Sequence, residues 1–169
     1  LIKKFEAGFK AGVKAVDDSI KVDTKYLTQP PDFSGFNSVD KGKAAAEGMY
    51  QGGADIVYHA AGGSGGGVFT AAKAAKKLAI GVDSDQAKTA APDVQSVIMS
   101  SMIKRVDVGV YTFIKSVADG SFKGGTTVFD LKADGVGYST TGGMIDDIKD
   151  KLEAYEADIV SGKIVVPAK

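Results

Sequence analysis

The 169-residue sequence contains no cysteine and a single histidine, and both shortages restrict its chemistry. Without cysteine it has neither disulfides nor cysteine-ligated zinc. The absence of cysteine is also compatible with an extracytoplasmic protein. The one histidine, His59, cannot form a histidine pair for a metal or a conventional hydrolase relay. We therefore expect no metal and no cofactor.

Net charge and long apolar runs are missing as well. Lys and Arg total 21 and so do Asp and Glu, so nothing marks the chain as a nucleic-acid binder. No run of about 18 apolar residues occurs, so the sequence as given predicts no membrane span. The length and the 44% share of hydrophobic residues instead predict one domain with a real core.

Helical and strand-like patterns alternate along the chain. Apolar residues recur at helical spacing around residues 2–16, 40–52, 67–78, 106–117 and 145–159. Short β-leaning runs occupy residues 21–27, 56–60, 79–82, 94–99, 126–131 and 163–166. This alternation predicts right-handed βαβ units, and hence an α/β fold in which a parallel sheet has helices on both faces.

A glycine-rich loop follows the second predicted strand. Residues 58–69 read YHAAGGSGGGVF, in which five of twelve residues are glycine. Glycine costs backbone entropy, so such a loop suggests that something approaches the backbone closely. That can be a packed neighbouring element, or a ligand bound to the N–H groups that open the next helix.

The loop matches neither common nucleotide-binding motif in full. A P-loop needs a lysine directly after its glycines, and the next lysine here is Lys73. The dinucleotide fingerprint needs a third glycine where Val68 or Thr70 stands. Asp83 nevertheless lies twenty residues after Gly63, as the ribose-binding acid of that fingerprint would. A dinucleotide-binding, Rossmann-like oxidoreductase domain therefore remains an alternative.

Two charged residues lie near the ends of later predicted strands. Asp83 ends the strand at 79–82, and Lys104 precedes the helix around 106–117. Ligands of open α/β sheets bind outside the carboxyl ends of the strands, where a carboxylate can accept two bonds from adjacent sugar hydroxyls. Each residue also has a simpler explanation, Asp83 as the start of a turn and Lys104 as a solvated side chain. We expect a competing carboxylate, Asp85, to face solvent or cap the next turn.

Tyr58 and His59 stand just before the glycine loop. Either ring could stack on a ligand, but strand alternation lets only one of them point toward a given face. A lone histidine at a strand end is more often structural. No acid–base pair, nucleophile elbow or metal-ligand cluster emerges elsewhere, so the sequence argues for binding and against an enzyme.

Several motifs together resemble one family. GADIVYHAAGGSGGGVF, AIGVDSDQ, VIMSSMIKRVDVGVY and SGKIVVP are similar to segments of the basic membrane protein (BMP, PnrA-like) lipoproteins, in the same order. The resemblance implies a bacterial, extracytoplasmic substrate-binding protein of an ABC importer, with the periplasmic-binding-protein type I fold. The implied partners are a purine nucleoside and the transporter permease. The lipid anchor that holds such proteins at the cell membrane is absent from this chain.

The resemblance also assigns residues. It implies that Asp83 and Lys104 bind the ribose hydroxyls and that the backbone at Gly62, Gly63 and Gly65 lines the pocket. Tyr58 and His59 remain possible ligand contacts.

The opening IKKFEAGFKAGVKAV is similar to a segment from the middle of the family's chains. We therefore expect mainly the C-terminal lobe of a two-lobed protein, with the N-terminal lobe absent. Residues 1–132 would form the ligand-binding lobe, and residues 133–169 a hinge crossing with a terminal helix and strand. Because the groups that grip the base would come largely from the other lobe, we expect weak binding and self-association.

Overall fold

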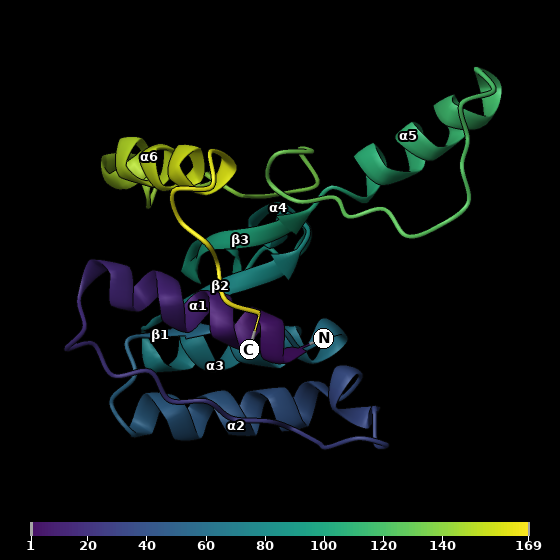
Figure 1. Cartoon of the computed structure of the whole chain (residues 1–169). Helices are drawn as coiled ribbons and strands as arrows, with labels where there is room; N and C mark the ends of the chain where they lie inside the picture. The colour runs from purple at the N-terminus through teal and green to yellow at the C-terminus, as the bar shows by residue number, and fades with distance from the viewer. Residues whose placement is uncertain (1, 169) are drawn as a thin grey trace.

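Four strands form one sheet at the centre of the structure, a computed structural model that describes residues 2–168 (Figure 1). The strand order follows the sequence: β1 (Ile56–Tyr58), β2 (Leu78–Asp83), β3 (Ile98–Lys104) and β4 (Val136–Tyr138). β1, β2 and β3 are parallel, and β4 is antiparallel to β3. The helices are α1 (Ile2–Val16), α2 (Val39–Gln51), α3 (Gly65–Ala75), α4 (Gln86–Thr89), α5 (Val106–Ala118) and α6 (Lys149–Val160).

The core lies between one face of the sheet and the helices α2 and α3. Phe69 and Ala72 of α3 are buried against Val57, Ala79 and Ile98, one inward-facing residue from each parallel strand. The helix α2 covers α3 and adds Ala46 and Tyr50, whose hydroxyl donates to the Leu78 carbonyl oxygen at 2.8 Å.

The other face of the sheet is covered by α1. Tyr58 points away from the core because strand residues alternate, and its ring lies 5.1 Å from that of Phe9 in α1. Figure 1 shows α1 lying across the strands on this side. Helices therefore cover both faces, as predicted, although no residue of α1 is fully buried.

The sheet differs from the prediction in strand limits and in one direction. β1 ends at Tyr58 instead of residue 60, and residues 95–97 form a 3-10 turn, so β3 begins at Ile98 and continues to Lys104. The predicted parallel sheet is confirmed for β1, β2 and β3, but β4, which the sequence did not indicate as a strand, adds an antiparallel strand at the edge. β4 pairs with β3 because the chain turns back at Gly135, whose carbonyl oxygen accepts from the Arg105 N–H at 2.9 Å.

Three predicted strands do not form. Residues 21–27, 126–131 and 163–166 lie outside every strand of the structure. Residues 21–27 instead run beside α1, where Thr24 and Tyr26 donate to the Glu6 carboxylate. An alternating sequence becomes a strand only when a neighbouring strand satisfies its backbone, and none of these segments has such a neighbour among residues 2–168.

The helix α5 leaves the body of the molecule. The sequence predicted a helix here from apolar residues at helical spacing, and no residue of α5 is buried. Figure 1 shows it projecting from the end of β3, with the following segment looping back toward the sheet. In the described part of the chain, no helix combines the length and apolarity needed to cross a membrane.

Candidate functional site

Asp83 and Lys104 meet where β2 and β3 end. The Asp83 Oδ1 and Lys104 Nζ atoms are 2.6 Å apart, and about half of the Asp83 side chain (51%) is exposed. Asp83 has a φ of 70°, in the left-handed region that non-glycine residues seldom adopt. Such backbone strain concentrates at functional sites, where the surrounding structure holds the residue in place. The predicted pair is therefore brought together, with one carboxylate oxygen facing Lys104 and the side chain open to solvent.

The turn after Asp83 is held by Gln86. Its Oε1 atom accepts from the Val82 N–H at 2.8 Å, and its own N–H donates to the buried Ser101 hydroxyl at 3.1 Å. Gly81 is needed here, because an added Cβ would lie 2.6 Å from both the Gln86 and Ser101 side chains. These contacts tie the ends of β2 and β3 together and so fix the position of Asp83.

Aromatic rings from α1 border the charged pair. The Lys104 Nζ atom lies 5.1 Å from the centre of the Phe5 ring, and Phe9 packs on Tyr58. Burial, with a contribution from the Asp83 charge, raises the pKa of Tyr58 to about 12, so this phenol stays neutral. Phe5 and Phe9 were predicted only as an apolar stripe. Their role beside the site could not be found from spacing, because it depends on where α1 crosses the sheet.

The glycine loop lies at the same edge of the sheet, after β1. Gly62 and Gly63 open a 3-10 turn, and the N–H groups that open a helix have no partner within it. Gly62 and Gly63 line a hollow of about 230 Å³ between the start of α3 and the segment around α4. Gln86 lines this hollow too, whereas Asp83 and Lys104 do not. The structure thus places the loop and the charged pair at one edge without enclosing them in a single pocket.

Gly65 supports the loop from within. Its N–H donates to the Gly62 carbonyl oxygen, and a Cβ at this position would lie 2.0 Å from the His59 ring. Gly67 is equally constrained, since its Cβ would lie 2.0 Å from the Val39 carbonyl oxygen of α2. Gly66 has nothing within 4 Å. Close packing, the simpler of the two explanations, therefore accounts for Gly65 and Gly67. It also contributes at Gly62 and Gly63, because an added Cβ would lie 3.1 and 3.3 Å from the Phe36 carbonyl oxygen, and Gly62 has a φ of 54°.

His59 is buried beneath this loop, with only 4% of its surface exposed. Its ring packs edge-on against Phe69, and Nε2 lies 3.0 Å from the Gln86 Oε1 atom. Because that oxygen accepts, Nε2 carries the proton, and Nδ1 is buried without a hydrogen-bond partner. Burial lowers the pKa of His59 to about 4, despite opposing contributions from Gln86 and Asp83. These contacts favour the structural role over a ligand contact.

Asp85 stands at the N-cap position of α4, as expected, but its side chain neither caps that turn nor faces solvent. Its carboxylate accepts from the Ser139 and Thr141 hydroxyls at 2.8 and 2.6 Å and pairs with Lys88 at 3.1 Å. Burial would raise the pKa of Asp85, but the bonds from these hydroxyls and Lys88 outweigh it and lower that pKa. Asp85 therefore fastens the segment after β4 to the end of β2, an interaction across 54 residues that local spacing cannot reveal.

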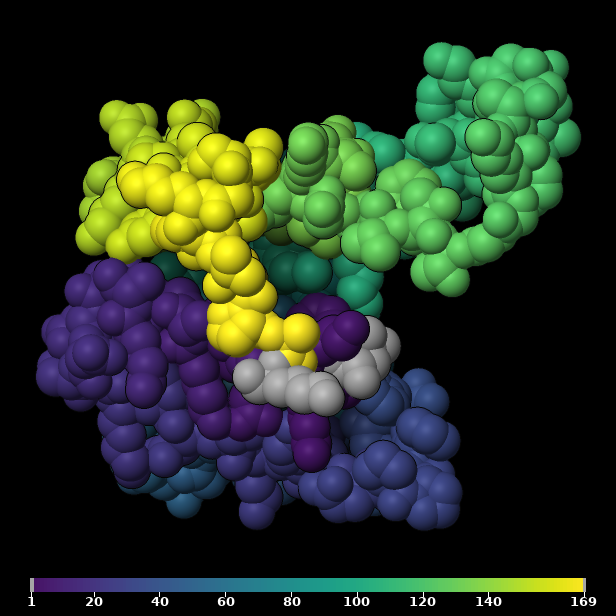
Figure 2. All heavy atoms as spheres, in the orientation of Figure 1, coloured from purple at the N-terminus to yellow at the C-terminus, as the bar shows by residue number. Residues whose placement is uncertain are grey.

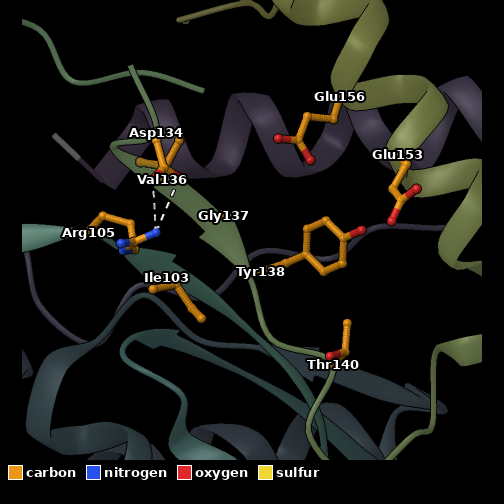
Figure 3. Close-up of a pocket in the computed structure, with 9 residues that line it drawn as sticks. All are labelled: Ile103, Arg105, Asp134, Val136, Gly137, Tyr138, Thr140, Glu153 and Glu156. Atoms are coloured by element: carbon orange, nitrogen blue, oxygen red, sulfur yellow. Dashed lines mark hydrogen bonds and ion pairs between the residues drawn. The ribbon is translucent and has the colours of Figure 1, made fainter. Parts of the chain in front are cut away.

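A second hollow, of about 320 Å³, lies between β4 and α6. Figure 3 shows Tyr138, Glu153 and Glu156 facing it from one side and the Arg105–Asp134 ion pair from another. It contains none of the residues predicted to bind a ligand. No group of three or more metal-ligating side chains occurs in the described residues, here or elsewhere.

Comparison with solved structures identifies the fold. The fold matches a solved ABC transporter solute-binding protein from Conexibacter woesei with a TM-score of 0.76 and 22% identity, over 96% of this chain and 51% of that one. The chain therefore has the α/β fold of about half of that solute-binding protein.

Sequence comparison gives the family. The profile described as "ABC transporter substrate-binding protein PnrA-like" (Bmp) matches residues 1–169, so the chain belongs to this family of substrate-binding proteins. It is 41% identical to the CD4+ T-cell-stimulating antigen of Listeria monocytogenes and 38% identical to the ABC transporter nucleoside-binding protein BmpA of Lactococcus lactis. Each match covers all of this chain and 50% of the relative, so the chain spans about half the length of these relatives.

Proposed function

We propose that the chain is the ligand-binding lobe of an extracytoplasmic receptor that captures purine nucleosides and delivers them to the permease of an ABC importer. The observation that carries the proposal is the Asp83–Lys104 pair, held at the carboxyl edge of the sheet by a strained backbone. Membership of a substrate-binding family supports a binding role and disfavours the dinucleotide-dependent oxidoreductase.

The pair suits a ribose. Adjacent sugar hydroxyls can donate to the two oxygens of Asp83, while Lys104 donates to a ribose oxygen. The Asp83–Lys104 pair carries no net charge, and it therefore favours a neutral ligand such as a nucleoside. A nucleotide would bring phosphate charge toward the exposed carboxylate.

The surroundings suit the rest of a nucleoside. Phe5 and Tyr58 provide an aromatic border beside the charged pair, and the Gly62–Gly63 backbone offers N–H donors nearby. Gly65 and His59 would act indirectly, by holding that loop. The Lactococcus lactis relative is named a nucleoside-binding protein, which agrees with this ligand class.

A titration with a panel of ligands tests the proposal. We expect calorimetry on the longest polypeptide that the gene encodes to show heat with guanosine, inosine or adenosine, and at least tenfold weaker binding of the matching 5′-monophosphates. Heat with NAD and none with the nucleosides would contradict it.

The 169-residue chain alone provides a second test. With one side of the ligand left in water, it should bind nucleosides only at about 1 mM, or roughly 4 kcal/mol of binding free energy. Micromolar binding by this chain as a monomer would show that it already contains the whole site.

A further inference from the structure

The hollow of about 320 Å³ between β4 and α6 lies apart from the proposed nucleoside site, because neither Asp83 nor Lys104 lines it. It is open to solvent, and Figure 2 shows α6, in yellow-green, on the outside of the molecule. Ligand pockets range from about 300 to 1,000 Å³, so the hollow suits a small molecule. The charges at its two ends indicate which kind of molecule that is.

One end of the hollow has two carboxylates for one guanidinium. The Arg105 Nη1 atom lies 3.1 Å from Asp134, and its Nη2 atom lies 3.0 Å from Asp107. Because two carboxylates share one positive charge, this end keeps a net negative charge. The Asp134 side chain is 72% exposed, and a carboxylate has about four acceptor sites, so Asp134 can accept further bonds from a ligand.

The opposite end has the same imbalance. Glu153 and Glu156 stand three residues apart, and so on one face of α6. Figure 3 shows both side chains extending from α6 toward the hollow. Lys149 lies 3.6 Å from Glu153, and among residues 2–168 it is the one cation paired with either glutamate. This end therefore also has two carboxylates for one positive charge.

Apolar and aromatic surface joins the two ends. Val136 and Tyr138 stand on the same face of β4, because strand residues alternate, and Ile103 of β3 lines the hollow beside them. Burial, followed by the charges of Glu153 and Glu156, raises the pKa of Tyr138, so its hydroxyl stays protonated. An alkyl chain can pack on this surface, and the face of the tyrosine ring attracts a cation.

We propose that the hollow binds a small alkylamine with a positive charge at each end, one held by Glu153 and Glu156 and the other by Asp134. Each ammonium group supplies the charge that its end lacks, and the alkyl chain covers the apolar surface between them. A lysine or arginine side chain of another protein would bring only one cation.

A metal ion does not suit the hollow. In the described part of the chain no three ligating side chains come together as metal ligands. The inference is also independent of the nucleoside, because it uses none of the residues that we assign to the ribose.

Calorimetry on the longest polypeptide that the gene encodes tests the proposal. Putrescine, cadaverine and spermidine should be titrated at constant ionic strength, with n-butylamine as the control that carries one charge. We expect the best of the three to bind more tightly than about 1 mM and n-butylamine to bind at least about tenfold more weakly. Equal binding of n-butylamine, or no saturable binding below about 10 mM, would overturn the proposal.

Hydrogen exchange locates the bound amine. A ligand that bridges α6 and the segment before β4 should slow amide exchange in α6 when the best amine is saturating. Slower exchange confined to other parts of the protein would place the amine elsewhere and contradict the proposal.

A matched pair of variants separates this site from the general negative charge around α6. E153Q combined with E156Q removes two charges from one end of the hollow, whereas D147N combined with D150N removes two charges from nearby residues that do not line it. We expect the first pair to weaken binding of the best amine at least about tenfold and the second pair by less than about twofold. Equal weakening by both pairs, or none by the first, would show that the hollow is not the site.

Discussion

The carboxylate of Asp83 and the ammonium group of Lys104 face each other across the ends of two parallel strands, 2.6 Å apart. Asp83 reaches this position only by adopting a left-handed backbone. That conformation costs a residue with a side chain about 1–2 kcal/mol. An exposed ion pair returns little of this, about 0–1 kcal/mol. Asp83 therefore lowers the folding stability, and in return it places a carboxylate at the edge of the sheet.

Substitution of Asp83 should separate these two effects. Asp83→Gly and Asp83→Ala both remove the carboxylate, but only glycine adopts a φ of 70° without strain. We expect Asp83→Gly to be more stable than Asp83→Ala by about 1 kcal/mol in urea unfolding. Equal stability of the two variants would show that the backbone here is not strained.

Gly65→Ala should destabilise the protein, because the new methyl group would meet the His59 ring. Overpacking of this kind costs about 1–3 kcal/mol. Gly66→Ala is the matched control, since its methyl group has nothing within 4 Å and alanine favours the helix by about 0.5–1 kcal/mol. Urea unfolding of both variants measures the difference. If the two substitutions changed the free energy of unfolding equally, the His59 ring would not pack against Gly65 in the folded protein.

His59 should make stability depend on pH. Its pKa is about 4 in the folded protein and 6.5 in its ordinary state, so between these values the unfolded chain binds a proton that the folded chain does not. Stability therefore falls as the pH drops from 6.5 to 4, by roughly 3 kcal/mol, and this contribution changes no further below pH 4.

Comparison with His59→Gln isolates that contribution from the carboxylates that titrate nearby. The wild-type protein should lose more stability than His59→Gln over this pH range in parallel urea titrations. Parallel profiles for the two proteins would mean that His59 is not buried in its neutral form.

Asp85→Ala should loosen the chain after β4. The substitution leaves the hydroxyl of Ser139, which is 3% exposed, without its acceptor, at a cost of about 1–3 kcal/mol. Lys88→Ala removes only the exposed partner of Asp85 and should cost less than about 1 kcal/mol. Faster amide exchange at residues 139–141 in Asp85→Ala alone would confirm the fastening. An equal loss of stability in both variants would contradict it.

Local pattern predicted the parts of this fold whose neighbours are near in sequence. The alternation of β1, α3 and β2 follows from short apolar runs and a helical stripe, and their pairing is between consecutive elements. The same reasoning failed for residues 21–27 and 126–131, because strand formation requires a neighbouring strand that the described chain does not supply. It also missed β4, since a three-residue strand carries almost no pattern.

The candidate site was predictable to a similar extent. The position of Asp83 at a strand end follows from sequence, because parallel strands share one carboxyl edge. Lys104 was placed only near that edge, since the predicted strand stopped at residue 99 and β3 continues to Lys104. The left-handed backbone of Asp83 and the approach of Phe5 could not be predicted, since both depend on tertiary contacts. The hydrogen bonds that the Ser139 and Thr141 hydroxyls donate to Asp85 were missed for the same reason.

The most direct test of the proposed function asks whether Asp83 recognises the ribose hydroxyls. Calorimetry on the longest encoded polypeptide should compare guanosine with 2′,3′-dideoxyguanosine, in the wild-type protein and in Asp83→Asn. Two charge-assisted bonds should contribute roughly 2–4 kcal/mol, so the wild type should prefer guanosine by at least about 30-fold. In Asp83→Asn most of that preference should disappear, because the variant loses the carboxylate that the hydroxyls bind. If Asp83→Asn weakened both ligands equally, or kept the full preference for guanosine, Asp83 would not be the ribose-binding residue.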